Sequence, residues 1–118
     1  MLARNFYEAE GDLKPSHDGI GEVKNVYVYR QEDFDTRLRF IIYSELEPGR
    51  SIGYHQHGDN EELYVILEGQ GTMTVNGESR PAKPGDVFLN KANWSHGLVN
   101  DSTGLLKILV FEVAGESV

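Results

Sequence analysis

The sequence contains no cysteine, which excludes disulfide bonds and thiolate chemistry. It also has no run of about 18 apolar residues, the length that a membrane-spanning helix requires. Residues 1–19 show no apolar stretch behind a basic head, so we expect no secretory signal peptide. Together these absences favour a cytoplasmic protein.

Positive charge is scarce as well. Lys and Arg number 11 against 19 Asp and Glu, which gives a formal net charge of −8. The basic residues do not cluster, whereas a nucleic acid partner would require a basic stripe. We therefore expect neither nucleic acid nor a membrane as a partner, and we attribute the acidity to solubility.

The pattern of β-rich stretches and turns predicts the fold. The 118 residues suit one domain with a modest core. Residues 1–25 are polar without a sustained period, and we interpret them as a short N-terminal arm. Beyond them, turn signals such as Asn76-Gly77 recur about every ten residues, as in a sandwich or barrel. We predict an all-β domain over residues 26–118, with strands at 26–30, 38–46, 51–57, 62–67, 72–75, 87–90, 96–100 and 105–113.

Two of the predicted strands, 62–67 and 105–113, are apolar on both faces. A strand in a small closed barrel needs only one apolar face, so something must cover the other. A second subunit would add buried area to a short chain, and the N-terminal arm is the alternative cover. We favour a homodimer, and an arm exchanged between its subunits would satisfy both interpretations.

A His-x-His pair, His55 and His57, stands before a short turn and Glu62. On a strand the two imidazoles point the same way about 7 Å apart, whereas on a helix they would diverge by about 200°. The turn brings Glu62 back beside His57. Alone, the pair is more often a polar strand edge than a metal site; with Glu62 the two interpretations balance.

A further ligand would decide between them, and His96 is the candidate. The chain has four histidines, and the remaining one, His17, lies in the polar arm. A lone histidine is more often structural than a ligand. Three imidazoles and one carboxylate would nevertheless leave a coordination position open, as catalytic metal sites do.

These residues resemble the first conserved motif of the cupin family. That motif is Gly, five residues, His-x-His, three or four residues, Glu, six residues and Gly. It is matched at every spacing by Gly49, His55, His57, Glu62 and Gly69.

The second cupin motif is matched with two departures. Gly85, His96 and Asn100 stand at the expected spacing, but Lys91 replaces a proline and Asn93 a glycine. Both departures fall on turn positions and put the shape of that loop in doubt rather than the ligands.

The resemblance implies a jelly-roll β-barrel, often dimeric, with His55, His57, Glu62 and His96 as ligands of one divalent metal ion per chain. The chain looks similar to single-domain members described as oxalate decarboxylase-like or mannose-6-phosphate isomerase-like. A mixed imidazole and carboxylate set favours iron or manganese, with nickel or zinc as alternatives.

For the function we expect an enzyme that acts on a small oxygen-rich metabolite, namely a carboxylate, a diketone or a sugar. The chemistry would be that of a dioxygenase-like oxidoreductase, a decarboxylase or an isomerase. The alternative is a non-catalytic module that binds a small molecule or sugar. Tyr64 is the candidate catalytic residue, although core or rim packing is its commoner role. Strand alternation predicts a pocket lined by Phe40, Ile42, Tyr64, Ile66, Trp94 and Leu98, and it turns Arg37 and Arg39 outward.

Overall fold

The computed structural model describes residues 1–115, so residues 116–118, the end of the predicted domain, lie outside the described residues. Within them no helix is long and apolar enough to cross a membrane. The elements are β1 (Asp12–Lys14), β2 (Val23–Arg30), a 3₁₀ turn η1 (Gln31–Asp33), β3 (Leu38–Leu46), β4 (Ser51–Gln56), β5 (Asn60–Glu68), β6 (Gly71–Val75), β7 (Glu78–Ala82), β8 (Val87–Asn90), β9 (Ser95–Val99) and β10 (Leu106–Ala114).

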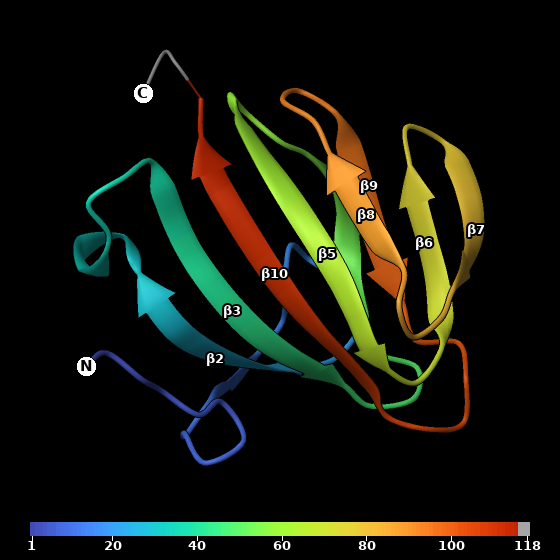
Figure 1. Ribbon diagram of the computed structural model, residues 1–118. Coiled ribbons are helices and arrows are strands. Elements are labelled where there is room, and N and C mark those ends of the chain that lie inside the picture. Colours follow the sequence, from blue (N-terminus) through green and yellow to red (C-terminus); the bar gives the residue numbers. More distant parts are fainter. Residues whose placement is uncertain (116–118) are drawn as a thin grey trace.

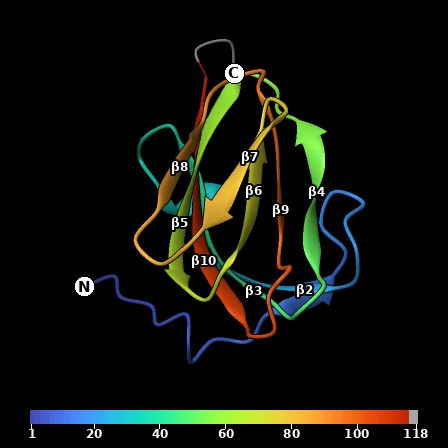
Figure 2. The same cartoon turned by 90° about the vertical axis from the view of Figure 1, so that its right-hand side faces the viewer.

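The strands form two antiparallel sheets that face each other (Figure 1). The larger sheet has the order β1-β2-β3-β10-β5-β8, and the smaller has the order β4-β9-β6-β7. Figure 2 shows the smaller sheet from its own side, with β4 and β9 at one margin. The predicted all-β jelly roll is confirmed, because the described residues contain strands and turns but no α-helix.

The hydrophobic pattern predicted the position of each strand that is buried on at least one face. β3 and β8 span the predicted residues, and the other predicted strands differ by a few residues at their ends. Two strands, β1 and β7, were not predicted. β7 is polar apart from Pro81 and Ala82 and lies at a sheet edge, so no apolar alternation marks it. β1 and the start of β2 extend the large sheet into residues that we assigned to the arm.

The arm returns to the barrel along the edge of β4 that lacks a strand partner (Figure 2). Ser16 forms a parallel bridge to Ile52, and its carbonyl accepts the N–H of Gly53 at 3.0 Å. A Cβ at Gly53 would collide with the carbonyl oxygen of His17, so this approach of two backbones requires glycine. The arm therefore closes the barrel between the two sheets.

The core fills the space between the sheets, and a second apolar cluster lies on the outer face of the large sheet. There Phe6 of the arm stacks on Tyr43, with ring centroids 4.4 Å apart. The arm thus covers the outer face over β2 and β3. Over β10, β5 and β8 that face stays apolar and partly exposed, with Val87 58% and Leu89 45% exposed.

Candidate metal centre

The barrel gathers the four predicted ligands at one end. His55 lies on β4 directly opposite His96 on β9, and directly paired residues of antiparallel strands point to the same face. His57 follows β4, and Glu62 comes back on β5 after a three-residue turn. His96 is fully buried, and the side chains of His57 and Glu62 are each 8% exposed. The strands β4, β5 and β9 therefore position the four side chains close to one another.

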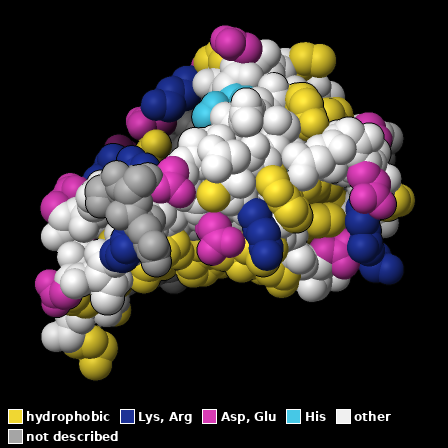
Figure 3. Space-filling model, turned by 90° about the horizontal axis from the view of Figure 1, so that it is seen from above, with side chains coloured by type: hydrophobic (Ala, Val, Ile, Leu, Met, Phe, Trp, Pro, Cys, Tyr) yellow, Lys and Arg dark blue, Asp and Glu magenta, His cyan; other side chains and the backbone are white. Residues whose placement is uncertain are grey.

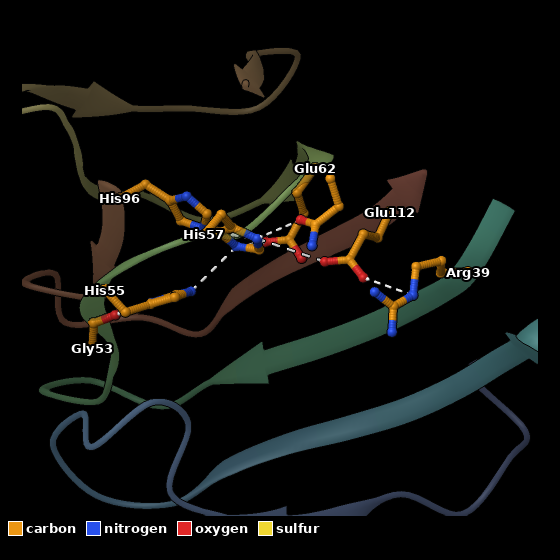
Figure 4. Close-up of polar contacts among 8 residues, drawn as sticks. Arg39, Gly53, His55, His57, Glu62, His96 and Glu112 are labelled. Carbon is orange, nitrogen blue, oxygen red and sulfur yellow. Dashed lines mark hydrogen bonds and ion pairs between the residues drawn. The ribbon is translucent and has the colours of Figure 1, made fainter. Parts of the chain in front are cut away.

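Neighbouring donor atoms are spaced as metal ligands are, in two groups that share His57: His55, His57 and His96 form one, and His57, Glu62 and Glu112 form the other. His55 Nε2 lies 3.3 Å from His57 Nε2, and Glu62 Oε1 lies 3.2 Å from the Nε2 atoms of both His57 and His96 (Figure 4). Neighbouring ligands with bonds of about 2.1 Å to one ion are about 3.0 to 3.4 Å apart, for octahedral to tetrahedral angles. The separations fit a bound divalent metal.

In His55 and His57 the second ring nitrogen, Nδ1, already forms a hydrogen bond. His55 Nδ1 donates to the Gly53 carbonyl at 2.6 Å, and His57 Nδ1 donates to Asn60 Oδ1 at 2.7 Å. With Nδ1 as a donor, the Nε2 atom of the neutral His55 ring carries a lone pair that faces His57 Nε2 and is available to a cation. Metal-bound histidines are typically fixed by such second hydrogen bonds.

Charge in this group is balanced within the barrel. Burial lowers the pKa of His55 to about 4, so this ring is neutral at pH 7. Burial acts the same way on His57, but the hydrogen bond and the charge of Glu62 outweigh it and raise the pKa. Burial would raise the pKa of Glu62, yet the hydrogen bonds from His57 and His96 bring it to about 2. A metal ion would take the place of the proton shared with Glu62.

A second carboxylate, Glu112 on β10, joins the site and was not predicted. It is buried, stands opposite Glu62 in the sheet, and its Oε1 lies 3.7 Å from His57 Nδ1. Burial and the negative charge of Glu62 raise the pKa of Glu112 to about 7. The sequence offered one indication of this role, because Glu112 is the polar residue on a strand face that otherwise consists of Leu106, Ile108 and Val110.

Arg39 binds Glu112 from the mouth of the barrel, with Nε 3.5 Å from Oε2 (Figure 4). The expectation that Arg39 turns away from the barrel was wrong. Residues 40 and 38 of β3 pair with residues 112 and 113 of β10, which leaves Arg39 as an extra residue in a β-bulge. A bulge breaks the alternation of side chains and re-aims one of them.

His17 also reaches the site, so all four histidines of the chain gather there. Its ring stacks on His55 with centroids 3.5 Å apart and planes at 7°. The backbone of His17 is left-handed, with φ of 50°. We had assigned His17 to the polar arm, and apart from the histidine count nothing in the sequence pointed to this contact.

A cavity of about 320 Å³ opens at His57 and Glu62, and His17 and Glu112 line it as well. Phe40, Ile42 and Tyr64 line it as expected. The structure puts the other three predicted pocket residues elsewhere, because Ile66 and Leu98 lie within the core and Trp94 lines a separate groove beside Phe88. Tyr64 is buried edge-on to His96, and burial and the charge of Glu62 raise its pKa well above 10.

Removal of one ligand should empty the site. We expect His57→Ala to lose most bound metal in elemental analysis of purified protein, because the three remaining donors cannot hold the ion as well. The control is Gln56→Ala, whose side chain is exposed and bonds the Asn93 carbonyl instead. Metal content that stays near one ion per chain in His57→Ala would show that the site is misassigned.

The raised pKa of Glu112 predicts a pH effect on the metal-free protein. Its stabilising contribution is fully present below the ordinary value of 4.5 and is lost as the pH rises through about 7. Glu112→Gln should therefore gain stability relative to wild type between pH 5 and pH 8, by on the order of 2 kcal/mol. Urea unfolding in the presence of a chelator measures this difference. The exposed neighbour Glu61 provides the control Glu61→Gln, and equal pH profiles for Glu112→Gln and wild type would contradict the assignment.

Known proteins resemble the chain in sequence and in fold. A family model described as a cupin domain matches residues 42–112. An "Oxalate-binding protein" of Thermotoga maritima is 34% identical, with 92% of this chain and 90% of that protein covered. A crystal structure of a predicted oxalate decarboxylase from Thermotoga maritima superposes with a TM-score of 0.91 at 30% identity, and covers 97% of this chain and 99% of that one.

A glucose-6-phosphate isomerase of Pyrococcus abyssi is 36% identical over 66% of this chain, which spans 48% of the isomerase. The likeness to the isomerase thus concerns one part of a longer protein. The family model covers more than half of the chain, and the Thermotoga relative covers nearly all of it. The chain belongs to the cupin family.

Proposed function

We propose that the protein is a metal-dependent enzyme that acts on a small carboxylic acid, with oxalate as the first substrate to test. The observation that carries the proposal is the convergence of His55, His57, Glu62 and His96, of which His57 and Glu62 also line a cavity of about 320 Å³. This volume lies at the lower end of the range for small-molecule sites, about 300 to 1,000 Å³. The names of the Thermotoga relatives add oxalate as a specific ligand.

The donor set guides the choice of metal. We propose His55, His57, Glu62 and His96 as ligands of one divalent ion per chain. Glu112 adds a second carboxylate next to Glu62, and carboxylate oxygens move the preference toward manganese and iron. Nickel and zinc remain the alternatives. When bound, the ion would polarise a carboxylate that chelates it and so favour loss of CO₂.

The residues around the ligands would orient the substrate and handle its proton. Tyr64 keeps its proton at neutral pH because its pKa is raised, so its hydroxyl acts as a donor and not as a base. It lies against Glu62 and lines the cavity, which supports the proposal of Tyr64 as a catalytic residue. Decarboxylation of oxalate requires one proton for each formate and CO₂ formed, and a donor beside the ligands could supply it.

The alternative function is a binding module that holds a small acid on the metal without turnover. The name of the 34% identical relative, an oxalate-binding protein, favours it. The two functions differ in one measurable respect, since only the enzyme releases product.

We also propose a homodimer built on the outer face of the large sheet. Phe111, Leu63 and Leu89 form one apolar row across β10, β5 and β8, and Leu109, Val65 and Val87 form the next. Seen from above, hydrophobic side chains gather along the margin that faces forward in Figure 1 (Figure 3). The arm leaves these rows partly exposed, and an apolar sheet face of this kind suits a self-complementary contact.

The substrate proposal predicts that metal-loaded protein binds oxalate and converts it to equal amounts of formate and CO₂. Calorimetry measures binding, and product assays with and without O₂ measure turnover. Glu62→Gln, which removes one charged ligand, should reduce both at least about tenfold. Binding without product would favour the binding module, and no binding by metal-loaded protein would contradict both functions.

The dimer proposal predicts the mass of two chains in sedimentation experiments with the wild type. The double variant Val87→Lys, Leu89→Lys should sediment as a monomer, because it places two charges in an apolar contact. Val99→Lys is the control, since Val99 is 41% exposed on the smaller sheet. A monomeric wild type would exclude the proposed interface.

A further inference from the structure

The cavity has a second polar end, away from the four ligands. Phe40 pairs with Glu112, which is level with Glu62, whereas Ser44 stands four residues further along the same strand. At about 3.3 Å per residue, Ser44 is about 13 Å along β3 from the row of the ligands. The cavity wall between these two rows is mainly apolar and includes Phe40, Ile42, Ile52 and Val110, beside the rings of Tyr27 and Tyr64.

Two side chains of the N-terminal half provide hydrogen-bond donors at this second end. Asn25 lines the cavity, and its Oδ1 accepts the hydroxyl of Ser44 at 2.6 Å, so its amide N–H groups remain as donors. Lys14 lines the cavity too. It pairs directly with Val23, which is fully buried, so its side chain leaves the sheet on the inner face.

Lys14 is the one Lys or Arg among the described residues that line this cavity. Within the described residues Lys14 forms no ion pair. Arg39, which does not line the cavity, forms an ion pair with Glu112. An ammonium group beside an amide that can donate is a receptor for a carboxylate. The cavity thus offers a metal site at one end and an anion site at the other.

The arm that carries Lys14 is held in place by several contacts with β4. Ile20 N–H donates to Ser51 Oγ at 2.7 Å, and Ser51 N–H donates to the Ile20 carbonyl at 3.0 Å. A Cβ at Gly19 would collide with the carbonyl oxygen of Ser51. Together with the His17 ring on His55, these contacts fix residues 17–20, which directly follow the Lys14 segment, relative to His55 and β4.

We infer that Lys14 and Asn25 determine specificity by binding a distal carboxylate of the substrate. The substrate class is a dicarboxylic acid with a chelating head, such as a 2-oxo acid group, a short apolar chain and a carboxylate tail. This inference rests on the proposed function, because the head must bind the metal, but it assigns a longer ligand than oxalate. The apolar wall would contact the chain between the two ends.

The test compares two five-carbon acids with the same head, 2-oxoglutarate and 2-oxopentanoate, which lacks the tail carboxylate. Calorimetry on metal-loaded wild type should give about tenfold tighter binding of 2-oxoglutarate. Lys14→Met should bring the two affinities within about twofold of each other and leave oxalate binding unchanged. Lys24→Met is the matched control, since Lys24 pairs with Leu13 and Glu45 on the opposite face and does not line the cavity.

Gly19→Ala provides a second variant, which displaces the arm without a change of charge and should also reduce the preference for the tail. Equal affinities of the two acids for the wild type, or a preference that survives Lys14→Met, would overturn the inference. Oxalate binding without 2-oxoglutarate binding would overturn it as well and leave the proposed function intact. Failure of all three acids to bind metal-loaded protein would contradict the proposed function itself.

Discussion

The structure depends on the gathering of three imidazoles around a buried carboxylate at one point inside the barrel. A buried Glu62 would be costly alone, but hydrogen bonds from His57 and His96 keep it ionised. The surrounding contacts follow from the same constraint. The Gly53 carbonyl and Asn60 fix two rings, and Glu112 is in turn held by Arg39. A divalent ion bound by these side chains would satisfy their charges together.

The gathering of the four side chains could be predicted from the sequence because most of their geometry is local. Strand alternation puts His55 and His57 on one face, and a short turn returns Glu62 beside them. His96 required only the spacing of a second motif. β3 and β8 were predictable for the same reason, since their residue types and flanking turns mark them without knowledge of their partners.

The contributions of Glu112, Arg39 and His17 depend on contacts between residues far apart in the chain. Glu112 joins the site through the register of β10 with β5, and Arg39 turns inward through a bulge that no residue pattern announces. His17 is brought in by the bridge of Ser16 to β4. Face alternation also misplaced Ile66 and Leu98, because it gives the face of a residue but not its depth along the barrel, and both lie within the core.

The most direct test of a metal centre at these four residues is anomalous diffraction from crystals grown with manganese. We predict one strong anomalous peak about 2.0 to 2.3 Å from the Nε2 atoms of His55, His57 and His96 and from Glu62 Oε1. The absence of a peak would contradict the account. So would a peak at a metal ion that is bound by Glu112 and His57 Nδ1 and not by these four atoms.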